Sequence, residues 1–332
     1  MSQSKCEVIR HRGWEVVRLS NESLQVDIVP SKGMDILSAK WLPKDLDVLW
    51  KSPWGLRHRK GPPPSGDSVV NFLAHYPGGW QTIFPNGGDA TTVNGVELGF
   101  HGEACLVPWD WEPIDQGLIA STRLHLSPFE LQKKVVVDDN RLTVTEVATN
   151  VGASPQEVMW SHHPAFGAPF ISSETRIETE SATFIADDVR DESAGDLEPG
   201  STSQWPFARS RDGASVDLSV LPGEQDRLDR FGYLTDFATG RALMTNPTIP
   251  LTIELTWDEQ IFPHAWYWLE AHATQTYPWF GEAYVFALEP ASSYPGQGIE
   301  AVRRKTGNLL RFEPGETKTA WVSLTFVTES FS

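Results

Sequence analysis

Residues 118–126 read LIASTRLHL and residues 138–144 read DDNRLTV, and these two stretches decide the expected fold. In the first stretch every second residue, beginning with its leucine, falls on one face of an extended chain. Leu142 and Val144 continue the alternation after the Asp-Asp-Asn turn. Because short period-two runs bounded by turn residues are typical of half-buried antiparallel strands, the segment predicts such strands.

The same alternation recurs within residues 24–28, 251–257 and 284–288. Residues 92–97, TVNGVE, give the strongest hairpin signal, because Asn-Gly suits the positive φ angles of a type I′ turn. Helical periodicity is scarce, and its best candidate is the stretch 222–231. Many short strands, frequent turns and few helices predict an all-β protein built as two packed sheets or a large sandwich.

The composition narrows the class of protein. The 332 residues are 40% hydrophobic and 21% charged, as in globular proteins, and we expect one domain over residues 1–332. The net charge of −17 argues against nucleic acid or a membrane as the main partner, because both need a cationic face. No apolar leader is visible and the two cysteines suit reduced thiols, so we expect a cytoplasmic location.

Two polar clusters in the first third of the chain carry groups suited to a hydroxylated ligand. Gln81 and Asn86 lie among the turns of GGWQTIFPNGGD, and amides both donate and accept hydrogen bonds. His101 and Glu103 lie in GFHGEACLVPWDW, on the same side of the chain if it is extended. The simpler interpretations are turn chemistry for the amides and a histidine at a strand end.

Two later clusters carry groups that transfer protons. His162 and His163 lie in MWSHHPAFGAPF, and strand alternation turns one of them toward any pocket. Glu289 ends the apolar strand of YVFALEPASSYPGQG, where partial burial would raise its pKa toward the range of a general base. The simpler interpretations are one buried and one exposed histidine, and a carboxylate at the rim.

The tryptophans are numerous, fourteen in all. We expect most of them to fill the space between sheets, because large aromatic side chains dominate cores. A few can instead offer a flat face to the C–H groups of a sugar ring, and Trp279 in YPWFG is the one we select.

In this order the clusters resemble the aldose 1-epimerase (galactose mutarotase-like) superfamily, and within it a divergent branch of uncharacterised epimerase-related proteins. The resemblance rests on the polar turn, the His-Gly pair, HHPAFG and the strand ending in LEP. VDIVPSKGMDILSAKW (26–41) and LLRFEPGET (309–317) extend it over nearly the whole chain. It implies a large antiparallel β-supersandwich with few short helices, and an enzyme that interconverts the α and β anomers of free aldoses.

The resemblance also implies roles for individual residues. His163 matches the general acid, Glu289 the general base and His101 a histidine that contacts the sugar. The family's Asn-Arg pair is absent, and Asn86 stands near the arginine position. The family's substrate-binding aspartate has no clear counterpart, Asp258 being a guess.

We therefore predict a sugar mutarotase that needs no metal or other cofactor and whose partner is a small-molecule sugar. The predicted ligand-binding residues are His101, Asn86, Gln81, Glu103 and Trp279. The oligomeric state stays open.

Three other functions remain open at this stage. One is a noncatalytic carbohydrate-binding protein. Another is a glycosidase or lyase, for which Glu103 with Glu289 is the carboxylate pair, roughly 5–9.5 Å apart in a hydrolase. The third is a metal site of His101, Glu103 and one of the paired histidines, whose spacing matches no zinc signature.

Two segments have the composition of loops. Residues 55–67, GLRHRKGPPPSGD, combine a basic run with three prolines, and residues 187–213 are rich in Asp, Glu, Ser and Gly. Each is expected to be a solvated loop, with a wall or lid over a binding face as the alternative. Arg57, Arg59 and Lys60 are the candidates for binding phosphate if the sugar is phosphorylated.

Overall fold

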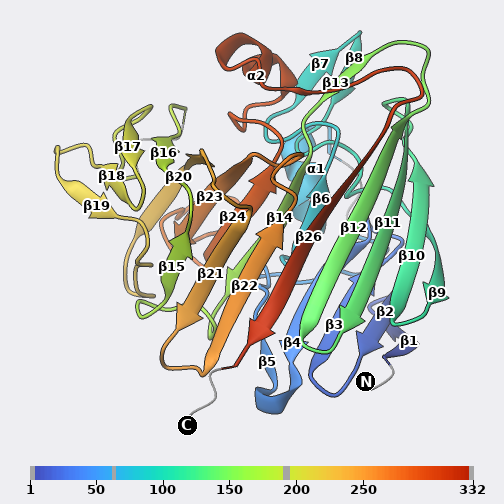
Figure 1. Cartoon of the computed structure of the whole chain (residues 1–332), viewed down its shortest axis with the longest axis horizontal. Coiled ribbons are helices and arrows are strands. Elements are labelled where there is room, and N and C mark those ends of the chain that lie inside the picture. Colours follow the sequence, from blue (N-terminus) through green and yellow to red (C-terminus); the bar gives the residue numbers. More distant parts are fainter. Residues whose placement is uncertain (1–3, 62–64, 190–194, 329–332) are drawn as a thin grey trace.

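The computed structural model describes residues 4–61, 65–189 and 195–328. Within this part of the chain, two large sheets pack face to face (Figure 1), one of twelve strands and one of eight. The strands pair antiparallel throughout the eight-stranded sheet and along the centre of the larger one. The predicted all-β sandwich is therefore confirmed.

The twelve-stranded sheet holds, in spatial order, β1 (Lys5–His11), β2 (Trp14–Ser20), β3 (Leu24–Val29), β4 (Asp35–Trp41), β6 (Trp80–Ile83), β14 (Ser161–Gly167), β24 (Tyr284–Ala291), β23 (His264–Ala271), β20 (Leu228–Thr235), β16 (Thr183–Ala186) and β17 (Thr202–Gln204), with β5 (Leu46–Asp47) beside β4. The eight-stranded sheet holds β15 (Arg176–Thr179), β21 (Arg241–Asn246), β22 (Leu251–Trp257), β26 (Thr317–Val327), β12 (Arg141–Asn150), β11 (Phe129–Asp138), β10 (Gly117–Arg123) and β9 (Asp110–Ile114).

Short pairs and helices complete the described structure. The pairs are β13 (Gln156–Val158) with β25 (Leu310–Phe312), β18 (Phe207–Arg209) with β19 (Ser215–Asp217), and β7 (Thr91–Val93) with β8 (Val96–Leu98). The helices are α1 (Ser68–His75), α2 (Ile299–Lys305) and the 3₁₀ turn η1 (Leu42–Lys44). None of these helices is long and apolar enough to cross a membrane.

The stretches that decided the expected fold form β10, β11 and β12. Val144 pairs with Val135 and Leu142 with Val137, and all four side chains are buried. The expected face does not extend to Leu126, which is 41% exposed because β10 ends before it, at Arg123. The apolar faces of both sheets meet in one core, which the fully buried Trp80, Trp160 and Trp257 help to fill.

The turn predictions have mixed outcomes. The hairpin over 92–97 is confirmed, with positive φ at both Asn94 (51°) and Gly95 (82°). The helix predicted over 222–231 is wrong. Residues 222–227 form turns, in which Asp226 accepts from the amide of Gly223, and β20 then pairs with β23. Pairing with a central strand outweighs the weak helical periodicity there.

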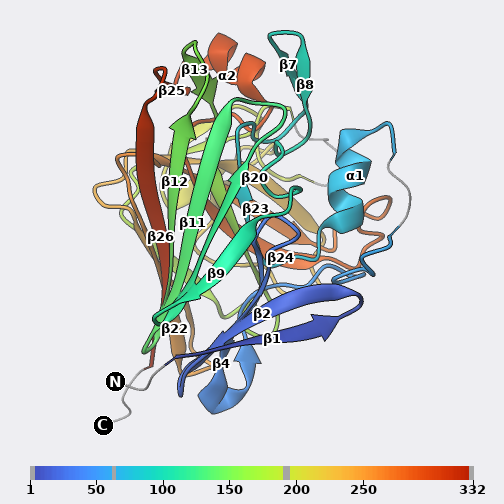
Figure 2. The same ribbon diagram turned by 90° about the vertical axis from the view of Figure 1, so that its right-hand side faces the viewer.

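The twelve-stranded sheet also has a second face, turned away from the eight-stranded sheet. Figure 2 shows α1 standing on that side, beyond β24 and β2. Alternation along β14 sends His162 into the core and His163 to this second face. The second face is where a ligand can reach the sheet.

Candidate active site

His163 and Glu289 lie side by side on adjacent strands. In the antiparallel register of β14 and β24, Ser161 faces Ala291 and Ala165 faces Ala287, which brings residues 163 and 289 opposite each other. His163 Nε2 lies 3.6 Å from Glu289 Oε1, and the side chains are 7% and 2% exposed. Two titratable side chains 126 positions apart in the chain therefore meet at one point.

A cavity of about 740 Å³ opens above this pair. Its volume lies in the range that holds ligands of drug size. Aromatic rings form much of its wall, and Trp268 lies closest to the pair, with its ring centroid 5.5 Å from that of His163. Trp279 lines the cavity as well, and Trp54 stacks on its outer side at 5.5 Å with an interplanar angle of 9°.

Burial keeps the imidazole of His163 neutral near neutral pH. Removal from water lowers its pKa to about 4. Its Nδ1 atom is buried and has no hydrogen-bond partner among the described residues. The ring is therefore held mainly by packing, against Trp268 on one side and Tyr76 at 5.7 Å on another.

His101 reaches the same cavity from the turn that follows β8. It has a positive φ of 61°, and its ring centroid lies 5.9 Å from that of His163. The backbone N–H of Gly88 donates to His101 Nδ1 at 3.1 Å. Burial, and to a smaller extent His163, lowers the pKa of His101 well below its usual value. A neutral ring that accepts at Nδ1 carries its proton on Nε2, so His101 offers a donor.

Tyr76 is a residue of the site that sequence reasoning missed. It caps the C-terminus of α1 and lines the cavity, and the indole of Trp54 donates to its carbonyl at 2.8 Å. Its hydroxyl is buried without a hydrogen-bond partner among the described residues. Burial raises its pKa well above the usual value, and the carboxylates of Glu289 and Asp35 add to this. The phenol therefore keeps its proton and can donate it to a ligand.

Three aspartates that sequence reasoning also missed line the cavity. Asp187 accepts from the hydroxyl of Tyr233 and from the amide of Gln297. Asp89 and Asp229 are the other two. No local motif marks these positions, because the segments between β16 and β24 that carry most of them meet only in the folded chain.

The predicted ligand-binding amides lie beneath the cavity and not in its lining. Gln81 Nε2 donates to Asp35 Oδ2 at 3.1 Å and to the carbonyl of Gly78 at 2.8 Å. Asn86 Nδ2 donates to the carbonyls of Asp89 and Gly99, at 2.8 and 3.0 Å. These bonds make Asn86 a support for the turn that carries His101, whereas we had expected it to bind ligand itself.

Glu103 and Asp258 are also placed outside the cavity lining. The Glu103 carboxylate accepts from the backbone amides of His125 and Leu126, at 3.2 and 2.9 Å. Asp258 caps a turn after β22, where it accepts from the amide of Gln260. Glu103 and Glu289 therefore do not flank one cavity as the glycosidase alternative requires.

The residues of the alternative metal site are not grouped around one point either. His162 faces the core, where Trp80 donates to its Nδ1 at 3.1 Å. No three His, Cys, Asp or Glu side chains of the described chain group closely enough to hold a metal ion. The cysteines are free thiols, Cys6 exposed and Cys105 buried.

Known proteins resemble this chain in sequence family and in fold. A family model described as a domain of unknown function, DUF4432, matches residues 11–326. None of the curated proteins matches this chain.

Several solved structures share the fold at low sequence identity. A galactose mutarotase-like protein from Clostridium acetobutylicum is 15% identical, with a TM-score of 0.69 over 98% of this chain and 99% of its own. The Slr1438 protein from Synechocystis sp. PCC 6803 is 17% identical, with a TM-score of 0.69 over 95% and 96%. A galactose mutarotase related enzyme from Lactobacillus acidophilus is 15% identical, with a TM-score of 0.65 over 94% and 97%. At these identities the likeness shows the fold.

Proposed function

Because this chain belongs to the DUF4432 family and has the galactose mutarotase-like fold, we propose that it interconverts the α and β anomers of an aldose. The observation that carries the proposal is the contact of His163 with Glu289 at 3.6 Å, on the floor of a cavity walled by aromatic rings. An acid and a base on one ring-sized site are what anomerisation requires.

The proposed reaction consists of paired proton transfers. Glu289 accepts the proton of the C1 hydroxyl, while His163 in its protonated form donates a proton to the ring oxygen. The bond between C1 and the ring oxygen breaks as the C1 carbonyl forms. Rotation about the C1–C2 bond then exposes the other face of the aldehyde. The reverse transfers close the ring and return both side chains to their starting states.

The remaining side chains of the cavity hold the sugar in this scheme. His101 Nε2 and the Tyr76 hydroxyl donate to sugar oxygens, since each carries a proton and both residues line the cavity. Trp268 and Trp279 pack on the apolar face of the ring. Buried donors aimed at fixed positions select for hydroxyl groups there, because an unpaired buried donor costs about 1–3 kcal/mol.

Polarimetry on freshly dissolved hexoses tests the proposal. We expect wild-type protein to accelerate the approach to anomeric equilibrium. His163→Ala and Glu289→Gln should each lose about 10²–10⁴-fold in kcat/KM. The matched controls are His125→Ala and Glu259→Gln, which change exposed residues of the same types. Full activity in both site variants, with folding verified by circular dichroism, would contradict the assigned roles.

A second candidate is a sugar-binding protein without catalysis. One observation favours it: burial lowers the pKa of His163 to about 4, which leaves little imidazolium to act as acid at neutral pH. In that case calorimetry would detect hexose binding that Trp268→Ala abolishes, while anomer exchange stayed at the rate of buffer alone.

A further inference from the structure

A group of unpaired cations lies at the end of the β1–β2 hairpin and on the segment that follows β5. We call it the basic rim; it consists of Arg10, Arg12, Arg57, Arg59 and Lys60, all exposed. No ion pair of any of the five is found within the described chain, although the net charge is −17. Several arginines elsewhere are ion-paired, as Arg18 is with Asp27 and Arg230 with Asp196. Clustered unpaired cations of this kind favour an anionic ligand.

Hydrogen bonds fix the segment that carries three of these cations. Arg12 Nη1 donates to the carbonyl of Leu56 at 3.0 Å, and the indole of Trp14 donates to that of Arg57 at 2.7 Å. The amide of Arg59 donates to the carbonyl of Arg12 at 3.0 Å. The backbone of residues 56–59 is therefore held against the hairpin. The prolines 62–64 of this loop lie outside the described residues, as do residues 190–194 of the other predicted loop.

Aromatic rings connect the basic rim to the cavity of the proposed active site. The guanidinium carbon of Arg57 lies 5.5 Å from the ring centroid of Trp54. Trp54 stacks on Trp279, which lines the cavity. Tyr277 lines it too; burial and then the charge of Asp67 raise its pKa, and the charge of Arg57 counteracts part of this rise. Arg57 is therefore connected to the cavity wall through the stacked rings of Trp54 and Trp279.

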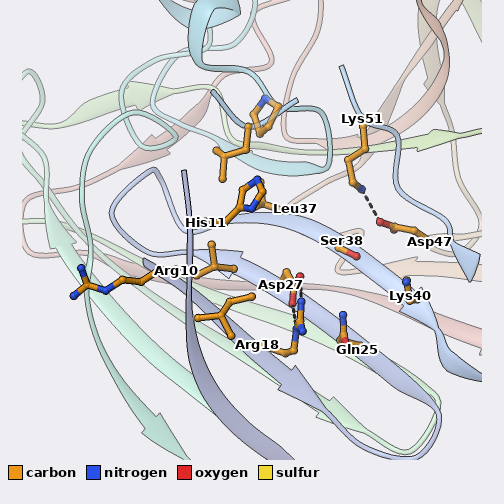
Figure 3. Close-up of a pocket in the computed structure, with 14 residues that line it drawn as sticks. Arg10, His11, Arg18, Gln25, Asp27, Leu37, Ser38, Lys40, Asp47 and Lys51 are labelled. Carbon is orange, nitrogen blue, oxygen red and sulfur yellow. Dashed lines mark hydrogen bonds and ion pairs between the residues drawn. The ribbon is translucent and has the colours of Figure 1, made fainter. Parts of the chain in front are cut away.

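On its other side the basic rim borders a second hollow, of about 400 Å³. Figure 3 shows Arg10 and His11 at one end of it, and the pairs Arg18–Asp27 and Lys51–Asp47 along it. These acidic partners neutralise Arg18 and Lys51, whereas Arg10, which lines this hollow too, belongs to the basic rim. The unneutralised charge is thus concentrated on the rim between the two hollows.

We propose that the sugar acted on is the reducing-end residue of a short acidic oligosaccharide, whose next residue places its anionic group on the basic rim. This inference rests on the proposed function. Arg57 lies outside the cavity lining, so the anion it binds belongs to a group beyond the reacting ring. Guanidinium groups bind carboxylate or sulfate in a bidentate fork. A short chain fits better than a polymeric polyanion, which the overall charge of −17 would repel.

Calorimetry with defined saccharides tests this assignment. The probes are trigalacturonate, galacturonate and maltotriose, at low and at 0.5 M salt, where exposed charges are screened to within about 4 Å. We expect trigalacturonate to bind at least about tenfold tighter than either other probe at low salt, and the advantage over maltotriose to vanish at high salt.

Charge-matched variants locate the effect. R57Q/R59Q/K60Q should lose the tenfold advantage, whereas R123Q/K134Q/R311Q, which removes three exposed cations elsewhere, should retain it. Equal binding of trigalacturonate and maltotriose by wild type, or unchanged binding in the rim variant, would overturn the proposal. So would galacturonate binding as tightly as the trimer, since the anion would then lie inside the cavity.

Failure of this inference is distinguishable from failure of the proposed function. Binding of trigalacturonate is measured without turnover, whereas mutarotation is followed on neutral hexoses, which do not use the basic rim. Mutarotation without selective trigalacturonate binding removes only the oligosaccharide assignment. Selective binding that the rim variant abolishes, without any mutarotation, keeps the anion site and removes the catalytic role.

Discussion

His162 and His163 are neighbours in sequence, yet they belong to two different environments on opposite faces of one strand. Burial lowers the pKa of both imidazoles to about 4. His162 lies in a packed network, 3.5 Å from Glu146, whose carboxylate is also 3.0 Å from Lys133. His163 contacts Glu289 and faces an open cavity. The comparison teaches that burial and a shifted pKa do not by themselves mark a proton-transfer group; access for a ligand does.

The largest effect expected from this comparison is in the pH dependence of mutarotation. If His163 acts as the acid, kcat/KM follows the imidazolium fraction of the free protein. With a pKa of about 4, that fraction rises about tenfold for each unit that the pH falls between 7 and 5. Polarimetry corrected for buffer catalysis measures this. A flat profile would remove His163 as the donor and leave the two histidines functionally alike.

The next largest effect distinguishes the two carboxylates. Glu146→Gln leaves the Lys133 ammonium buried without its ionic partner, which typically costs about 3–5 kcal/mol of stability. Glu289→Gln should change stability far less, while it lowers kcat/KM about 10²–10⁴-fold. Urea denaturation of both variants, beside the wild type, measures the contrast. Equal stability losses in the two variants would mean that Glu289, like Glu146, mainly stabilises the fold.

Acid should destabilise the fold through both histidines. Each folded pKa, about 4, lies below the ordinary value of 6.5, so the unfolded chain binds more protons. The corresponding stability is fully present above pH 6.5 and is lost as the pH falls to about 4, by about 3 kcal/mol per imidazole. His163→Asn should remove the part of this stability loss that the His163 imidazole contributes. Urea midpoints between pH 7 and 4 test it, and a wild-type stability independent of pH would contradict it.

The smallest effect concerns Tyr76. Tyr76→Phe removes only the buried hydroxyl, so we expect stability to stay within about 1 kcal/mol and kcat/KM to fall about tenfold to a hundredfold. The loss should appear for sugars that carry the contacted hydroxyl and be absent for the matching deoxy sugar. Comparable losses for both sugars would show that the phenol only packs.

Sequence reasoning succeeded where the information is local. Alternation around 118–126 and 138–144 predicted β10 and β12, and Asn94-Gly95 predicted the turn between β7 and β8. The resemblance supplied His163 and Glu289, and the register of β14 and β24 places them opposite each other, while their catalytic roles stay a prediction.

Sequence reasoning failed where the residues that contact each other are distant in the chain. The side-chain amide of Asn86 donates to carbonyls of nearby turns. It also accepts from the backbone N–H of Ile299, 213 positions away. Gln81 is likewise held by Asp35. Nothing in the segment around Tyr76 marks it, since only the packing of α1 over β14 brings its ring beside His163. Weak helical periodicity near 222–231 was overruled by pairing of β20 with β23.

The bond from Gly88 to His101 has a stereochemical consequence. With Nδ1 already occupied, the ring presents a single N–H direction, along which the proposed function places a sugar oxygen. Epimers that differ at the carbon bearing that oxygen place it axially or equatorially, and only one orientation meets the proton. If His101 binds the sugar as we propose, the angle at which the main-chain amide of Gly88 holds its imidazole selects the preferred epimer.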